Sequence, residues 1–164
     1  MKKKKQIKPI KGSGENHAYL YTGSTKSNIL GLERASFMGP GTNLTKRLKQ
    51  NSQPKTYSDK VSQAHDIRYG LSENISDIRI ADNKMLKSLK KASKEKLDYK
   101  FNIIQGNVGI NTKIFLEDKL GVKPEFFTDF GINNLTKEEI DLYSNKLKIL
   151  QQEGFGVIRM KCKF

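Results

Sequence analysis

The chain has 164 residues, and its 31 lysines and arginines against 17 aspartates and glutamates give a formal net charge of +14. This length favours one domain, or one small domain with extensions. The charge predicts an anionic partner, which is nucleic acid, a phospholipid surface or an acidic protein. Cys162 is the only cysteine, which excludes an intramolecular disulfide and argues against a small secreted scaffold. No run of about 18 apolar residues is present, so we expect no membrane-spanning helix.

Residues 1–28 have the composition of a basic flexible tail. Lysines dominate the first positions and a stretch rich in glycine, serine and asparagine follows, so little of this segment is expected to become buried. It is either a solvated basic arm or an arm that serves as a nuclear-localisation signal or contacts nucleic acid. No apolar segment follows MKKKKQIK, so we expect no secretory signal there. We assign no role to His17, which lies in this polar stretch.

Two signals follow the tail, a glycine-rich loop and a helix. In FMGPGTNL, residues 37–44, the glycines are typical of a loop because they adopt backbone angles closed to other residues. A helix is predicted from about residue 59 to residue 71, with Ser58 or Asp59 as its N-cap. Three of its residues lie four positions apart and therefore share one helix face: Val61, His65 and Tyr69.

A second helix is predicted from about residue 77 to residue 98. Its apolar stripe at helical spacing consists of Ile78, Ala81, Met85, Leu89 and Ala92. Asp82 falls within this stripe, and a carboxylate facing a core is costly unless it has a hydrogen-bond or charge partner. Lysines on the opposite face are either simply solvated or, in a lipid-binding protein, in contact with anionic headgroups. These lysines are Lys84, Lys87, Lys91 and Lys94.

In the C-terminal third, the signals of secondary structure are weak before the capping box at 136–139. We expect a loop at Asn107–Asn111, a short helix near 112–120 that ends at Gly121, and an irregular connection in KPEFFTDFGINN. The sequence TKEE at 136–139 is a capping box, which predicts a helix from about 137 to 152. Its apolar face is Ile140, Tyr143, Leu147 and Leu150, and its stop is Gly154. The ending FGVIRMKCKF is either a strand or a basic amphipathic tail.

The chemistry centres on His65. If the two helices pack antiparallel, Asp82 can reach His65, fix its tautomer and leave the other ring nitrogen free to take a proton. Such a pair is a general-base device. We find no serine or cysteine nucleophile in a strained motif nearby, so an activated water is the simplest nucleophile.

Asp66 follows His65 about 100° further round the helix, so the two side chains cannot fully share a face. Asp66 could point to the glycine loop at 37–41. Backbone carbonyls of such a loop together with one carboxylate form a hard oxygen site that suits calcium. A metal there could hold a substrate carbonyl and stabilise an oxyanion.

These residues resemble the calcium loop and catalytic helix of phospholipase A2. The closer likeness is to the disulfide-free viral type in the unique region of parvovirus minor capsid proteins. The likeness covers about residues 35–95, and its order of motifs makes it more specific than His-Asp-x-x-Tyr alone. The matching residues are Gly39-Pro40-Gly41, Leu44, Pro54, Ser58-Asp59, His65-Asp66, Tyr69 and Ala81-Asp82. Phe37 stands where the secreted enzymes usually have tyrosine.

The resemblance implies roles for the residues that match. The metal ligands would be the backbone carbonyls of Phe37, Gly39 and Gly41 and the carboxylate of Asp66, with Ca²⁺ as the cofactor. His65 would be the base that activates water against the sn-2 ester. The other catalytic residues would be Asp82, which orients His65, Tyr69, which joins the same hydrogen-bond network, and Gly39, whose amide helps to hold the oxyanion.

The resemblance also implies a fold, a division of the chain and a setting. The fold would be mainly α, with two antiparallel catalytic helices, an N-terminal calcium loop and a helical C-terminal extension. Residues 29–100 would be the phospholipase A2-like core. Residues 101–164 would be the extension, which either covers the core or docks to a capsid or a membrane. The setting would be a virion and then a host endosomal membrane, cytoplasm or nucleus after entry.

Two functions are compared. The first is a calcium-dependent phospholipase A2 that acts at a phospholipid surface without spanning it, in a viral protein used for host membrane breach. Its basic tail would contact nucleic acid or capsid proteins. The second is a catalytically inactive basic virion structural protein that binds nucleic acid or lipid. The joint presence of His65, Asp66 and Asp82 favours the enzyme, because a pure binder has no need of that set.

Overall fold

The structure is a computed structural model that describes residues 17–23, 30–123 and 131–155. It is mainly helical with a small two-stranded sheet, which confirms the predicted mainly α class. Of the helices in these described ranges, none combines the length and the apolar character needed to cross a membrane. The elements are β1 (Tyr19–Tyr21), β2 (Leu32–Arg34), α1 (Leu44–Lys49), α2 (Tyr57–Gly70), α3 (Ile75–Glu95), α4 (Lys100–Leu120), the 3-10 helix η2 (Ile132–Asn134) and α5 (Lys137–Gln152).

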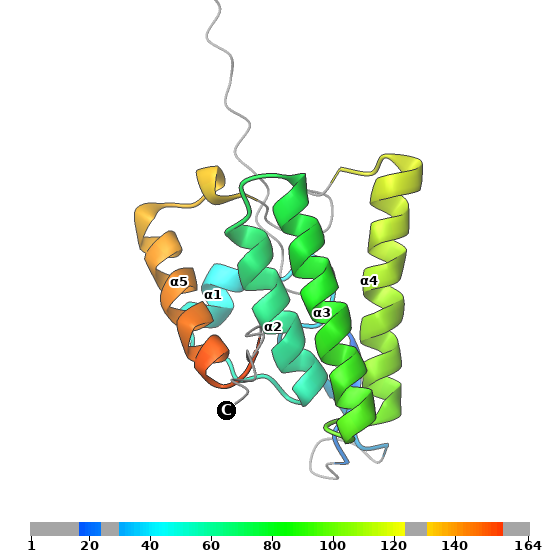
Figure 1. The fold of residues 1–164 in the computed structure, drawn as a ribbon. Coiled ribbons are helices and arrows are strands. Elements are labelled where there is room, and N and C mark those ends of the chain that lie inside the picture. Colours follow the sequence, from blue (N-terminus) through cyan, green and yellow to red (C-terminus); the bar gives the residue numbers. More distant parts are fainter. Residues whose placement is uncertain (1–16, 24–29, 124–130, 156–164) are drawn as a thin grey trace, which may run out of the picture.

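Helices α2 and α3 lie side by side at the centre and run in opposite directions (Figure 1). Helix α4 packs against α3 at one edge of the molecule, and α5 packs against α2 at the other. Strands β1 and β2 pair antiparallel, with Leu20 opposite Glu33, and β1 contacts α4. The central helix α2 therefore has neighbours on most sides, which explains why most of its residues are buried.

Helix α2 begins two residues before the predicted start, because Thr56 is its N-cap. Thr56 has an extended backbone, and its side chain accepts a hydrogen bond from the Asp59 N–H at 3.2 Å. The predicted N-cap, Ser58 or Asp59, is therefore wrong. Both residues lie inside the helix, and the carboxylate of Asp59 is used for contacts outside it.

Helix α3 confirms the predicted apolar stripe. All five stripe residues are buried, and Asp82 between them is fully buried. The helix begins after Asn74, whose side chain accepts from the Asp77 N–H, and it ends before Lys96, which is left-handed with φ of 55°. The periodicity of apolar residues was sufficient to predict this stripe, because one side of α3 faces the core and the other faces solvent.

Helix α4 contradicts the prediction of a loop at Asn107–Asn111 and a helix only near 112–120. One continuous helix runs from Lys100 to Leu120, and Gly121 follows it as the left-handed residue expected there. Its glycine and asparagine residues have local uses. A Cβ at Gly106 would lie 3.0 Å from Leu89, so this glycine lets α4 approach α3 closely. The Asn107 side chain donates to a backbone carbonyl within the helix.

Helix α5 has the predicted capping box and a partly buried apolar face. The Thr136 side chain accepts from the Glu139 N–H, and the Glu139 side chain accepts from the Thr136 N–H. Tyr143 and Leu150 are buried, and Ile140 and Leu147 are half-buried. Of the predicted irregular connection, Lys123 and residues 131–134 are described, and residues 124–130 lie outside the described ranges. The predicted strand or tail at the C-terminus also lies outside them, except for Phe155.

The described residues form two hydrophobic clusters, of which one crosses the predicted division at residue 28 and the other the division at residue 100. Ile103 of α4 and Tyr143 of α5 pack in the same hydrophobic cluster as Phe37 of the glycine loop. The prediction of a tail over residues 1–28 is wrong for 17–23, because β1 lies there and Leu20 is fully buried. His17, placed in a polar stretch by the sequence, is also buried. A helix pair with one loop has too little apolar surface to close a core alone, so the flanking segments complete it.

Candidate active site

A cavity of about 560 Å³ brings together most of the residues singled out by the sequence. The glycine loop, α2, α3 and α4 all contribute to its walls. Phe37, Gly39, His65 and Asp66 are among its lining residues. Gly41, Tyr69 and Asp82 are not among them, but Tyr69 and Asp82 both contact His65, which lines the cavity.

His65 lies between two carboxylates. Its Nε2 is 2.8 Å from Oδ1 of Asp82, so the predicted contact between α2 and α3 is present. Its Nδ1 is 3.2 Å from Oδ1 of Asp66, at the cavity wall. Burial of the ring opposes its protonation, but the hydrogen bonds with Asp66 and Asp82 outweigh burial and raise the pKa of His65. A ring whose Nε2–H donates to Asp82 presents Nδ1 to the cavity as its proton acceptor.

Asp82 is held by two cations that the sequence analysis did not identify. The Lys113 Nζ lies 3.1 Å from both Asp82 oxygens, and the Arg79 Nη1 lies 2.8 Å from Oδ2. Lys113 is itself buried, on the inner side of α4. Burial alone would raise the pKa of Asp82, but the hydrogen bond with His65 and the charge of Lys113 outweigh it and lower that pKa. These partners account for a carboxylate within an apolar stripe.

Glu117 links Tyr69 to the same network. The Tyr69 hydroxyl donates to Glu117 at 3.2 Å, and Glu117 also contacts Lys113 at 3.0 Å and Arg79 at 2.6 Å. The Lys113 Nζ stands 4.6 Å from the centre of the Tyr69 ring, which is a cation–π contact. Tyr69 thus belongs to the predicted network through Glu117. Lys113 and Glu117 are four residues apart on α4, so their side chains share one face of that helix.

Asp59 anchors the glycine loop. Its fully buried carboxylate accepts hydrogen bonds from the backbone N–H groups of Ser36, Phe37 and Met38 at 2.8–2.9 Å, and from Lys55 at 2.9 Å. Hydrogen bonds to an ionised acceptor are roughly twice as strong as neutral ones. In a chain whose one cysteine allows no internal disulfide, this carboxylate ties the loop to α2.

The glycine loop turns with two glycines at positive φ, 143° at Gly39 and 76° at Gly41. Other residues adopt such angles at a cost, so the glycines are required by the turn itself. The carbonyl oxygens of Phe37 and Gly39 both lie within reach of the Thr42 hydroxyl, at 3.1 Å and 3.3 Å. One hydroxyl proton cannot satisfy both carbonyls at once. The two oxygens therefore converge, and one of them retains capacity for a further partner.

One carboxylate oxygen of Asp66 has the surroundings expected of a cation ligand. Its Oδ2 is buried and has no hydrogen-bond partner, while its Oδ1 faces His65. Burial raises the pKa of Asp66, and this effect outweighs the opposing contact with His65. Within the described ranges, no group of three or more His, Cys, Asp or Glu side chains could hold a metal. The predicted ligand set is of another kind, because it joins one carboxylate to backbone carbonyls, and these are ligands that calcium accepts.

Comparison of the chain with protein-family models, curated proteins and solved structures finds no match. The site is therefore interpreted from its own chemistry, which consists of a buried histidine–aspartate pair, a tethered glycine loop and a carboxylate oxygen without a partner beside a cavity.

Proposed function

We propose that the protein is a calcium-dependent phospholipase A2 that hydrolyses the sn-2 ester of glycerophospholipids. The observation that carries the proposal is the His65–Asp82 pair, whose 2.8 Å contact leaves Nδ1 of His65 at the wall of a cavity bordered by the glycine loop. The apolar part of that wall, which includes Phe37, Met85 and Ile110, suits an acyl chain. Two antiparallel catalytic helices and a calcium loop are part of this proposal.

The chain's own residues supply the proton transfers. When Asp66 turns from the ring towards the loop, Nδ1 of His65 can accept a proton from water while that water attacks the ester carbonyl. Asp82 accepts the Nε2–H and stabilises the imidazolium that forms. The bond to the glycerol oxygen then breaks, and the proton on Nδ1 passes to that oxygen. The products are a fatty acid and a lysophospholipid.

The negative charge that develops on the ester oxygen needs stabilisation. The Gly39 amide is proposed to donate to that oxygen. Ca²⁺ would be held by the carbonyls of Phe37, Gly39 and Gly41 and by Asp66, and when bound it would supply electrophilic stabilisation of the same charge. The unpartnered Oδ2 of Asp66 supports this choice of ligand.

Release of fatty acid from vesicles tests the proposal. With phospholipids that carry different sn-1 and sn-2 chains, we expect the purified full chain to release only the sn-2 acid, and to do so with calcium but not with chelator. Identification of the released acid by mass spectrometry reports the position of cleavage. Equal release with chelator would contradict the calcium dependence of the proposed reaction. No release under either condition would contradict the phospholipase itself and favour a catalytically inactive basic virion protein.

Lys113 is expected to act as a positioning residue within this reaction. Lys113→Met removes its charge-assisted bonds to Asp82 but keeps the apolar stem, so we expect kcat to fall by about 10- to 100-fold with a smaller change in KM. Steady-state kinetics measure this split. Lys113→Arg keeps the charge and is expected to recover part of kcat. Lys91→Met, at an exposed ion pair with Glu95, is the matched control and should leave both constants unchanged.

The proposed setting is a viral particle that breaches an internal host membrane during entry, with the virion and then the host endosomal membrane, cytoplasm or nucleus as its locations. The basic residues in the first part of the chain and the net charge of +14 support contact with nucleic acid or capsid proteins.

A further inference from the structure

Helix α4 is apolar on two opposite sides. Its inner side is buried against α3 and includes Ile103 and Ile110. Its outer side also carries a row of large apolar residues, each more than half exposed, which we call the outer stripe. The outer stripe consists of Phe101 at 51%, Ile104 at 59%, Val108 at 59% and Phe115 at 54%. Their spacing places them along one helix face. Because α4 forms an edge of the molecule, no other described element covers this row (Figure 1).

The outer stripe is continuous with the mouth of the cavity that contains His65. Ile104 and Val108 belong to both, since each is exposed and also lines that cavity. A molecule that covered the outer stripe would therefore face the opening of the candidate active site. Contiguous exposed apolar rows of this kind mark contacts with membranes or proteins.

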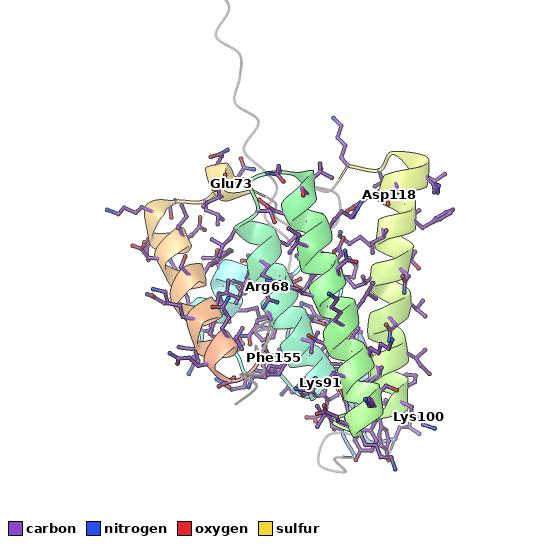
Figure 2. All side chains as sticks on the ribbon, viewed as in Figure 1. Arg68, Glu73, Lys91, Lys100, Asp118 and Phe155 are labelled. Atoms are coloured by element: carbon purple, nitrogen blue, oxygen red, sulfur yellow. The ribbon has the colours of Figure 1, made fainter. Side chains whose placement is uncertain are left out.

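Charge and aromatic residues favour one occupant. Lys100 and Lys119 are exposed near the two ends of α4. The neighbouring carboxylate of Asp118 is held by Arg79 at 2.5 Å, so it is partly neutralised. Figure 2 shows Lys100 and Asp118 near opposite ends of the helix. At the Lys100 end, Tyr99 is half-exposed and packs edge-to-face on Tyr21. Apolar side chains with flanking lysines and tyrosines are the composition of surfaces that lie on anionic bilayers.

Two other occupants fit less well. A second copy of the chain would bring lysines at the ends of both stripes together, in a protein that already carries a net charge of +14. Nucleic acid would bind the lysines, but the apolar side chains of the outer stripe would then face a charged phosphate backbone.

We propose that the outer stripe of α4 is the surface with which the protein lies on an anionic phospholipid bilayer, with the cavity mouth turned towards the lipid. This inference deepens the proposed function and rests on it for the nature of the substrate. Binding itself requires no hydrolysis, so the two can be tested separately.

The test uses the full chain with His65→Gln, in chelator, and vesicles of zwitterionic lipid alone or with an anionic phospholipid. Co-sedimentation measures the partition of the protein. Ile104→Ser with Val108→Ser is expected to weaken binding to anionic vesicles by about 10- to 100-fold. Lys119→Glu is expected to weaken it by about 10-fold on anionic vesicles and little on zwitterionic ones. Ile149→Ser, at a 48% exposed residue of α5, is the matched control and should bind like the parent.

A second measurement depends on the absence of tryptophan from the chain. Val108→Trp provides the only indole, and its fluorescence is expected to shift to shorter wavelength on addition of anionic vesicles. Ile149→Trp, the control, should show no shift. Unchanged partition of the Ile104 and Val108 double variant, or equal shifts at both tryptophans, would overturn the proposal. A stable dimer that dissociates in the double variant would overturn it in favour of a second copy.

The outcomes for binding and for hydrolysis are distinguishable. If binding to vesicles depends on the outer stripe but the wild-type chain releases no fatty acid, the docking surface is supported and the phospholipase activity is contradicted. If the wild-type chain releases fatty acid but its binding to vesicles does not depend on the outer stripe, the phospholipase activity is supported and the docking surface is contradicted.

Discussion

Replacing His65 by Gln is expected to lower the rate of fatty acid release by about 10²–10⁴-fold, the usual contribution of a general base. Glutamine retains an N–H group that can donate to Asp82 but has no ring nitrogen to take a proton from water. The buried carboxylate therefore keeps a partner and the fold should persist. The rate is measured with vesicles at saturating calcium, and far-UV circular dichroism on heating checks the fold.

His17→Gln is the control for this change, because His17 is the only other histidine and is also buried. We expect this variant to keep most of the activity, since the Asp82 carboxylate keeps its contacts with His65, Lys113 and Arg79. Equal rates in His65→Gln and wild type would show that His65 is not the base, whatever lipid is cleaved.

Replacing Asp59 by Asn is expected to lower the free energy of unfolding by about 3 kcal/mol or more. Four backbone N–H groups point at the carboxylate, and an amide offers them one oxygen and turns its own NH₂ group towards the others. A loss of this size is a large part of the stability of a small domain. Urea denaturation followed by circular dichroism measures it.

The same variant should also bind calcium more weakly, because Asp59 holds the loop whose carbonyls are the proposed ligands. Calcium titration by calorimetry measures this second effect. It is done without urea, on the folded variant. Asp77→Asn is the matched control. Asp77 accepts one hydrogen bond, from the exposed Glu73 N–H, so its loss should cost roughly 0.5 kcal/mol and leave calcium binding unchanged. Similar losses in both variants would contradict the role given to Asp59.

Helices α3 and α5 could be predicted because their signals are local. An apolar stripe with a solvated opposite face defines the phase of α3, and a reciprocal cap defines the start of α5. Asp82 was recognised for the same reason, since a carboxylate in a well-phased stripe is visible without any knowledge of its partners. The contact between His65 and Asp82 followed from packing the two helices that carry them, α2 and α3, antiparallel.

Helix α4 could be predicted only near 112–120, because the same signal is missing from the rest of it. A helix that is apolar on its inner and outer sides has no preferred face, and its glycines and asparagines resemble a loop. The sequence predicted a helix near 112–120 but did not place it against α3, so nothing linked Lys113 and Glu117 to Asp82. Lys113 was therefore missed as a partner of Asp82, and the outer stripe was missed because α4 was not recognised as one continuous helix.

The sequence by itself determined the mainly α class, the phase of the central helix pair and the residues that could carry proton transfer, because helix periodicity and motif order are properties of the chain alone. Only the tertiary structure decided how buried charge is compensated. Asp59 looked like a helix cap but holds the backbone of a loop, and Asp82 lies against a lysine from a helix 31 residues further along the chain. Such contacts join residues with no local pattern between them, and they form only when the elements pack.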